Sequence, residues 1–477
     1  MKPPRRRNRQ RGSRRPSPAA GAGTAQRKSA TGVERARARA KTGAGSLRLV
    51  LIEKPIYGGA FLSRIAGKAV FVPLTLPGEQ ARVCVVEEKR SYASGEPEEI
   101  LSVAPERIAP ACPYFGACGG CQYQHASYEA QIRFKQDILR ETLERAGVRA
   151  PEAIAVLAGE PWAYRNRIRL AFDDEGGLGY RGRRSHAIVP VDECPIAAPL
   201  LVRAALAAAE VARRFSPAFQ PAEMSLFCNG DETSLLIGIL ASAAAKARLD
   251  DFARALSEQV PEVKGIELLA AGRARQSPRT VASWGGTFLL YLAAGFAYRV
   301  DHGAFFQVNR WLVDTLVERV RSNHTGALAW DLYAGVGLFA RRLATNFARV
   351  VAVESAPAAM AALAHNLMGT SGVAVQASTL EFLRRANRNE RRHPIIPDLI
   401  VADPPRTGLG AETADLLART GAPALVYVSC DPATLARDLR AMIAAGYAIE
   451  RLTLADLFPQ TFHIETIAEL RRLDSRA

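Results

Sequence analysis

A cysteine near the C-terminal end of the chain follows a pattern typical of a buried strand. Residues 424–429 are mostly apolar and partly β-branched, which predicts a strand that brings Cys430 to the carboxyl edge of a sheet. Asp431 and Pro432 suit the N-cap and the first position of a following helix. Because a helix N-terminus lowers the pKa of a neighbouring thiol, Cys430 is a candidate nucleophile. A lone cysteine at a strand end is more often an inert core residue.

Three acidic residues also lie at the ends of predicted strands. From about residue 300 a pattern of strand, loop and helix repeats, which is typical of a doubly wound α/β domain. Asp331 ends the first strand, and Glu354 ends the second at a spacing that suits a carboxylate holding ribose hydroxyls. Asp403 ends a later strand, where two prolines hold it at the sheet edge or simply form a turn. This acidic edge favours an adenosine cofactor with a positive sulfonium over one with phosphates.

Four cysteines form a second candidate centre. Cys112, Cys118 and Cys121 share a glycine-rich loop, and three thiolates at this spacing can point at one metal centre. The fourth ligand must come from elsewhere, and Cys194 is the natural choice. The residues alone leave open a structural zinc ion, an iron–sulfur cluster or unligated thiols. Seven cysteines grouped in this way indicate metal binding in a reducing, cytoplasmic compartment rather than a disulfide framework.

The N-terminal part of the chain should form a small barrel. Short alternating apolar runs between residues 47 and 107 are separated by turns at 57–59 and 76–79, as expected for several short strands. The pattern resembles the TRAM domain, an OB-like RNA-binding module. Several basic side chains of this part could meet phosphates or form a solvated face. They are Lys54, Arg64, Lys68, Lys89 and Arg90.

The segments that follow are expected to link the barrel to the α/β domain. We predict a helix from Tyr128 to about Ala146. Arginines and tyrosines then alternate at 162–169 and 178–184, where they could bind RNA or face solvent from a sheet. At the other end of the chain, His463 and Glu465 are two residues apart, so on a strand they would face the same side.

Composition and charge exclude some classes of protein. The 477 residues contain 48% apolar side chains but no apolar run long enough to cross a bilayer, so we expect a soluble protein of two to four domains. Residues 1–46 contain fourteen Lys and Arg against one acid, so most of the net charge of +16 lies in this segment. Its composition predicts a disordered tail that binds phosphates non-specifically, and it also fits an organelle transit peptide.

Taken together, these motifs resemble those of the S-adenosylmethionine-dependent RNA uracil-5-methyltransferases. The match extends from the TRAM-like start to Glu465 and includes 305–309, 331–337, 403–406, 429–432 and 458–461. Ala334 and Leu338 depart from the family pattern, which has cysteine commonly at the first position and a polar residue often at the second.

The resemblance implies a fold, two cofactors and a set of site residues. After the basic tail (1–46), it implies a TRAM-like OB β-barrel (47–107), a central iron–sulfur and RNA-binding α+β domain (108–295) and a class I, Rossmann-like methyltransferase domain (296–477). A [4Fe-4S] cluster would be held by Cys112, Cys118, Cys121 and Cys194. S-adenosyl-L-methionine would contact Gln307, Tyr333, Glu354 and Asp403. In the family the residue matching Phe305 stacks on the target base.

The chemistry explains why such residues are needed. Uracil C5 is too weak a nucleophile to accept a methyl group unaided, so a thiolate first adds to C6, a step for which Cys430 is the matched residue. A base must then remove the C5 proton, and Glu465 is the matched base. His463 could orient Glu465 or simply pack, and we favour packing. The target base must be unstacked, which favours a loop or single strand as substrate.

We therefore expect a monomeric enzyme that forms 5-methyluridine in RNA and has no membrane partner. The combination of TRAM module and cluster points, by resemblance, to ribosomal RNA, with transfer RNA as the alternative substrate. A non-catalytic RNA-binding or assembly factor that keeps a dead methyltransferase fold is the competing class. The presence of both Cys430 and Glu465 argues against it.

Overall fold

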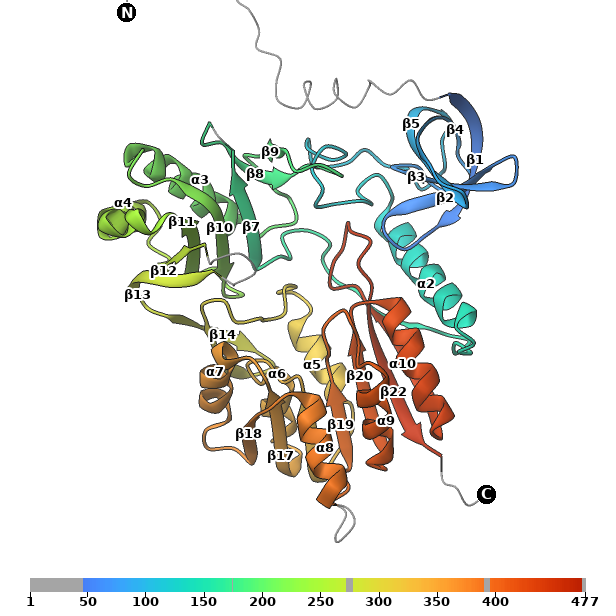
Figure 1. Ribbon diagram of the computed structural model, residues 1–477, viewed down its shortest axis with the longest axis vertical. Coiled ribbons are helices and arrows are strands. Elements are labelled where there is room, and N and C mark those ends of the chain that lie inside the picture. The colour runs from blue at the N-terminus through green and yellow to red at the C-terminus, as the bar shows by residue number, and fades with distance from the viewer. Residues whose placement is uncertain (1–45, 174, 272–277, 390–394, 474–477) are drawn as a thin grey trace, which may run out of the picture.

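The computed structural model describes residues 46–173, 175–271, 278–389 and 395–473, and Figure 1 shows them as a small barrel and two larger sheets flanked by helices. The predicted basic tail lies, except for its last residue, outside the described residues. Every helix of the described part of the chain is too short or too polar to cross a bilayer.

The first five strands form a closed barrel in the order β1-β2-β3-β5-β4. Their bounds are β1 (Leu47–Pro55), β2 (Ala60–Ile65), β3 (Lys68–Pro73), β4 (Gln80–Glu88) and β5 (Tyr92–Ser102). Register shifts in the β1–β2 and β4–β5 pairs bend the strands, which lets so short a sheet close. Phe61, Val72 and Val83 are fully buried inside it. The predicted N-terminal barrel is confirmed.

Helix α2 (Tyr128–Arg145) joins the barrel to the C-terminal part of the chain, and it matches the predicted helix. The ring of Phe134 meets that of Phe61 in the barrel, with centroids 5.5 Å apart. In the middle of the helix, the fully buried Lys135 forms an ion pair with Asp456 at 2.5 Å and donates to the carbonyl of Phe458 at 3.0 Å. The helix therefore fixes the chain just before the last strand relative to the barrel.

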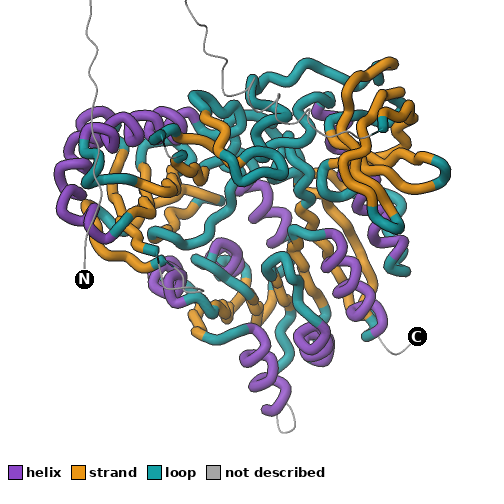
Figure 2. Tube along the Cα trace, turned by 45° about the horizontal axis from the view of Figure 1, so that its top comes forward, coloured by secondary structure: helices purple, strands orange, loops and turns teal. Residues whose placement is uncertain are grey.

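A seven-stranded sheet occupies the middle of the chain, in the order β13-β12-β11-β10-β7-β8-β9. Its strands are β7 (Arg167–Phe172), β8 (Leu178–Arg181), β9 (Ile188–Pro190), β10 (Pro221–Cys228), β11 (Leu235–Ala241), β12 (Val263–Ala270) and β13 (Arg279–Gly285). The alanine-rich helix α3 (Pro199–Arg214), the 3-10 helix η1 (Ala243–Arg248) and α4 (Leu249–Gln259) share one apolar core with it. The chain between the barrel and α2, which contains the cysteine loop, lies between this sheet and the barrel in Figure 1, and loops fill the same region in Figure 2.

The C-terminal part contains a hairpin, β14 (Phe288–Ala293) and β15 (Phe296–Asp301), and an eight-stranded sheet in the order β18-β17-β16-β19-β20-β22-β21-β6. The strands of the large sheet are β6 (Ala155–Leu157), β16 (Gly326–Leu332), β17 (Phe347–Glu354), β18 (Gly372–Gln376), β19 (Leu399–Ala402), β20 (Ala424–Ser429), β21 (Tyr447–Ala455) and β22 (Glu465–Arg472). Its helices are α5 (Val313–Arg321), α6 (Leu338–Leu343), α7 (Pro357–Leu367), α8 (Thr379–Asn389), α9 (Ala411–Arg419) and α10 (Pro432–Ala444).

Both faces of the large sheet are covered by helices. Side chains alternate along its strands, so Val401 and Val426 join one apolar core while Ile400 and Leu425 join the other. Strands β16 to β20 run parallel, so the loops that follow them emerge at one edge. The predicted doubly wound α/β architecture is confirmed. Strand β6 lies within residues 108–295, the range expected for the central domain, but it pairs with β21 of the large sheet.

Candidate active site

The register of the large sheet brings the predicted nucleophile and base together. Cys430 directly follows β20, and the antiparallel strand β22 begins at Glu465. Because Ser429 pairs with Thr466, Glu465 lies opposite Cys430 across the two strands. Asp403 follows the neighbouring strand β19, and its charge acts on both groups. Three residues far apart in sequence therefore meet at one edge.

Cys430 is half-buried at the N-terminus of α10, as predicted. Asp431 caps the helix, since its Oδ1 accepts from the backbone N–H groups of Ala433 at 3.0 Å and Thr434 at 2.9 Å. The expected lowering of the thiol pKa is wrong. Burial and the charges of Glu465 and Asp403 raise the pKa of Cys430 to about 12. Desolvation and two carboxylates outweigh the helix dipole.

Three carboxyl groups at this edge, those of Glu465, Asp403 and Asp331, have raised pKa values. Burial, together with the charge of Asp403, raises the pKa of Glu465 well above its usual range. Burial also raises the pKa of Asp403 to about 7. The pKa of Asp331 is raised to about 8 because the residue is fully buried near both Asp403 and Glu354. A cation bound at this edge would favour the ionised carboxylates and would itself be stabilised by them.

Asp331 also provides an unsatisfied acceptor. Its Oδ2 accepts from the backbone N–H of Ala340 at 2.8 Å, while its buried Oδ1 has no hydrogen-bond partner among the described residues. Glu354, at the end of β17, accepts from the backbone N–H groups of Gly335 at 2.8 Å and Ala356 at 2.6 Å. These acidic groups, with the unsatisfied acceptor of Asp331, fit a ligand that carries hydroxyls and positive charge, as a sulfonium nucleoside does.

The other predicted cofactor and substrate residues lie on loops around this edge. Tyr333 follows β16 with a φ of 64°, a left-handed conformation that a tyrosine rarely adopts. Gln307 is buried, and its backbone carbonyl accepts from the Asn166 side chain at 2.8 Å. Two residues earlier, Phe305 is 61% exposed, although Phe306 packs on Tyr291 with ring centroids 4.4 Å apart. An exposed aromatic ring on an anchored segment is available for stacking.

His463 does not share a strand with Glu465, because β22 starts only at Glu465. It lies instead in the loop 458–463, which we call the catalytic loop, and its ring packs on Phe462 with centroids 4.4 Å apart. Its Nδ1 accepts from Arg406 at 3.1 Å. Burial and the positive charge of Arg406 lower the pKa of His463 to about 4, so the ring is neutral.

Arg406 is a site residue for which the sequence predicted no role. Its charge lowers the pKa of both Cys430 and Glu465, against the effect of burial. Its position directly after the Asp403-Pro404-Pro405 turn was the available signal. The two residues that depart from the family pattern, Ala334 and Leu338, are buried in the apolar core.

The four cysteines of the second centre line one cavity of about 360 Å³. Cys112, Cys118 and Cys121 come from the loop before α2, and Cys194 comes from the segment after β9. No group of three potential ligands in the described ranges is arranged to hold a single metal ion. Arg165 and Tyr180 also line this cavity. Thiols from two separate segments that line one cavity are a donor set that fits a cluster larger than one ion.

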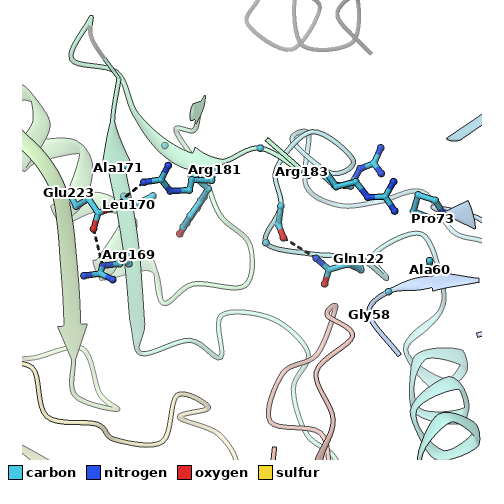
Figure 3. A pocket seen from close by; sticks show the side chains of 17 residues that line it. Gly58, Ala60, Pro73, Gln122, Arg169, Leu170, Ala171, Arg181, Arg183 and Glu223 are labelled. Atoms are coloured by element: carbon cyan, nitrogen blue, oxygen red, sulfur yellow. Dashed lines mark hydrogen bonds and ion pairs between the residues drawn. The ribbon is translucent and has the colours of Figure 1, made fainter. Parts of the chain in front are cut away.

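A basic cleft of about 530 Å³ lies beside the cysteine loop, between the barrel and strands β7, β8 and β10 (Figure 3). Glu223 on β10 contacts Arg169 at 3.3 Å and Arg181 at 3.4 Å, and both dashed contacts are visible in Figure 3. The side chains of these arginines are 70% and 55% exposed. Arg183 is bound to Glu96 of the barrel at 2.6 Å. The cleft thus has exposed guanidinium groups and a floor rich in glycine.

The fold, together with the acidic edge at the ends of β16, β17 and β19, defines a class of protein, a Rossmann-like methyltransferase. The tRNA (uracil-5-)-methyltransferase family model matches residues 291–473. The crystal structure of Pyrococcus abyssi tRNA (uracil-54, C5)-methyltransferase, in complex with S-adenosyl-L-homocysteine, has the same fold, with a TM-score of 0.70, 23% identity and coverage of 89% of this chain and 100% of that chain.

Two curated relatives match nearly the whole chain. An uncharacterized RNA methyltransferase of Streptomyces avermitilis is 34% identical over 87% of this chain and 95% of its own. The 23S rRNA (uracil(1939)-C(5))-methyltransferase RlmD of Halomonas elongata is 32% identical over 91% of each chain. The chain therefore belongs to the S-adenosylmethionine-dependent RNA (uracil-5-)-methyltransferases, and the predicted family and enzymatic class are confirmed. It methylates uracil C5 in RNA.

Proposed function

We propose that the protein methylates C5 of a uridine in 23S ribosomal RNA through a covalent bond between Cys430 and uracil C6. The observation that carries this proposal is the pairing of β20 with β22, which sets Glu465 opposite Cys430. A nucleophile and a base on adjacent strands can reach neighbouring atoms of one pyrimidine ring. The relatives named for 23S ribosomal RNA, which match nearly the full chain, favour that substrate.

The two side chains act in sequence on the uracil ring. The thiolate of Cys430 forms a bond to C6, and the electrons of the C5–C6 double bond move into an enolate that makes C5 nucleophilic. S-adenosyl-L-methionine, when bound, supplies an electrophilic methyl group. Glu465 then takes the proton from C5, so that the double bond returns and the Cys430 thiolate leaves. Because both pKa values are raised, the rate should increase with pH above neutrality.

We assign cofactor binding to Gln307, Tyr333, Glu354 and Asp403. When ionised, the acidic groups provide the negative potential that favours a sulfonium, and the buried Asp331 interacts with both Asp403 and Glu354. The exposed ring of Phe305 is assigned to stacking on the flipped target base. Such a contact contributes about 1–3 kcal/mol per base, so Phe305→Ala should raise the KM for RNA.

We assign a [4Fe-4S] cluster to Cys112, Cys118, Cys121 and Cys194. The support is that all four thiols face one cavity from two chain segments. Anaerobically purified protein should be brown and contain iron and acid-labile sulfide in equal amounts. Cys194→Ser should lose both. A colourless protein with one equivalent of zinc would contradict this assignment.

The basic cleft supports an RNA substrate that is single-stranded near the target. Guanidinium groups on a glycine-rich floor suit an unpaired backbone, whose phosphates need close approach. We propose that the enzyme acts as a monomer in the cytoplasm, where ribosomal RNA is assembled.

Substrate and mechanism are tested together. Ribosomal and transfer RNA from a strain lacking this gene should be digested and compared with wild type by mass spectrometry. We expect the loss of one 5-methyluridine from 23S ribosomal RNA and its return with the wild-type gene, but not with Cys430→Ala. Loss from transfer RNA instead would establish the alternative substrate. If Cys430→Ala restored the modification, the covalent mechanism would be wrong.

A further inference from the structure

The loop after β19 presents an arginine on the solvent side of the active site. Arg406 is exposed, whereas Cys430 is half-buried and Glu465 is buried. No carboxylate among the described residues forms an ion pair with Arg406, although Arg437, which contacts the same loop, is paired with Asp438 at 2.8 Å. An exposed guanidinium without a counter-charge, next to a reactive centre, is suited to bind an anionic group of the substrate.

The backbone that carries Arg406 is fixed. The N–H of Gly408 donates to the carbonyl of Pro405 at 2.8 Å, so Arg406 is the second residue of a closed turn. The hydroxyl of Thr434 donates to the carbonyl of Arg406 at 3.2 Å. Thr434 belongs to the first turn of α10, the helix whose N-terminus carries the nucleophile. The turn is therefore fastened to the segment that holds Cys430.

The side chain of Arg406 is oriented as well. Its guanidinium donates to Nδ1 of His463 at 3.1 Å. The His463 ring packs on Phe462 with centroids 4.4 Å apart and meets Phe458 at 5.4 Å, which holds this acceptor in place. Because the imidazole is neutral, it orients the guanidinium without cancelling its charge. A guanidinium has several N–H donors, so one bond to His463 leaves others for a ligand.

Arg406 thus connects the two segments that carry the reacting groups. Its backbone is bound to the start of α10, directly after Cys430, and its side chain is bound to His463, two residues before Glu465. A uracil ring between Cys430 and Glu465 would occupy the less exposed part of the site. The ribose and phosphates of the same nucleotide would remain on the solvent side, where Arg406 lies.

We propose that Arg406 binds one of the two phosphates that flank the target uridine, and that His463 is its positioning residue. The planar guanidinium fork can form two parallel hydrogen bonds with a phosphate. A phosphate held in this way keeps the flipped nucleotide from returning to the base stack. The inference rests on the proposed function, because it requires a uridine at Cys430. It does not depend on whether the RNA is ribosomal or transfer RNA.

The test is a binding cycle between protein and RNA. Synthetic RNA contains the uridine mapped by mass spectrometry, with natural linkages or with an uncharged methylphosphonate at one flanking position. Fluorescence anisotropy gives the Kd in the Cys430→Ala background, so that no adduct contributes. With natural RNA, Arg406→Ala should raise the Kd about tenfold. The methylphosphonate should do the same to the protein that keeps Arg406. The two changes together should have no further effect.

His463→Phe tests the positioning role. The variant keeps an aromatic ring against Phe462 and removes the acceptor of the guanidinium. Its Kd for natural RNA should rise by less than that of Arg406→Ala, and its loss of affinity for methylphosphonate RNA should be smaller than in the parent protein. In the Arg406→Ala protein, His463→Phe should change neither value. A purely structural role would weaken the binding of both RNAs equally.

Arg440→Ala is the matched control. Arg440 is an exposed arginine further along α10, so the variant loses the same charge from the same domain. Its Kd should be within twofold of the parent value, because distant exposed charges are screened. The full effect of the methylphosphonate should remain.

Two results would overturn the inference. One is an unchanged Kd in Arg406→Ala, and the other is a methylphosphonate effect that is as large in Arg406→Ala as in the parent protein at both flanking positions. The proposed function is tested separately, by trapping with 5-fluorouridine-containing RNA. If Cys430→Ala still forms an adduct, or if no uridine can be mapped, the proposed function fails. If Cys430→Ala forms no adduct but the binding cycle is additive, only the inference fails.

Discussion

The acidic edge of the large sheet and the basic cleft of the central sheet hold ionisable groups of opposite type in opposite environments. At the edge, Asp331 is fully buried and Glu465 is only 6% exposed, so desolvation keeps their protons on. In the cleft, the side chains of Arg169 and Arg181 are more than half exposed and remain in water. Burial thus makes each charge at the edge costly until a ligand arrives, whereas charges in the cleft cost little and act jointly.

This difference separates two kinds of effect on activity. A change at the edge alters one reacting atom, so it should affect kcat strongly and respond to pH. A change in the cleft removes one of several contacts to a polyanion, so it should affect KM and respond to salt.

The largest effect is expected at Glu465. Glu465→Gln keeps the size of the side chain but cannot take a proton, so we expect kcat to fall by roughly 10² to 10⁴. The addition of Cys430 to C6 does not need this base, so the covalent complex with RNA should still form and accumulate after the methyl group is transferred. Denaturing gel electrophoresis with labelled RNA measures the complex directly.

Cys430→Ala is the control for this experiment, because it should be equally slow but form no complex. If Glu465→Gln turned over at the wild-type rate, another group would be the base. If it gave neither turnover nor complex, Glu465 would be needed before the proton is removed.

A smaller effect is expected in the cleft. Loss of the phosphate contacts of Arg169 and Arg181 in the double variant to Ala should raise the KM for RNA about tenfold and leave kcat unchanged. The slope of log KM against log salt should become shallower by about one for each arginine removed.

Glu223→Gln is the matched variant, since it releases both arginines from their carboxylate partner. It should lower the KM for RNA slightly. A salt dependence that is the same in all three proteins would exclude the cleft from RNA binding.

The sequence was sufficient where local signals decide the structure. The apolar run before Cys430, the Asp431 cap and Pro432 predicted a strand–helix junction that the structure reproduces. It was insufficient where the decisive neighbour comes from a distant segment. The raised pKa of Cys430 depends on Asp403 and Glu465, which come from the ends of two other strands. No periodicity in the chain reports such contacts.

The cysteine centre shows the same limit in another form. Spacing alone grouped Cys112, Cys118 and Cys121, and Cys194 was added as the natural fourth ligand. The structure places all four around one cavity, because β7 to β9 return the chain to the loop. Ligand identity still depends on chemistry that neither spacing nor backbone geometry determines.

The smallest effect is expected for stability, and it depends on pH. Burial and neighbouring carboxylates raise the pKa of Asp331 to about 8 in the folded protein. Between that value and the unfolded pKa of about 3.9, the folded state binds more protons, so its stability falls as pH rises. Asp331→Asn cannot titrate, so its melting temperature should gain on wild type by roughly 2–4 °C between pH 5 and pH 8.

A comparison of S-adenosyl-L-methionine with S-adenosyl-L-homocysteine, which lacks the positive charge, makes this melting-temperature measurement more specific. At pH 8 the charged cofactor should stabilise wild type more than the neutral product does, because it offsets the ionised carboxylates at the edge. In Asp331→Asn that difference should shrink. Scanning calorimetry at both pH values gives all of these quantities. A melting-temperature difference between the two proteins that stays constant from pH 5 to pH 8 would show that Asp331 keeps an ordinary pKa, and the edge would then be no more charge-sensitive than the cleft.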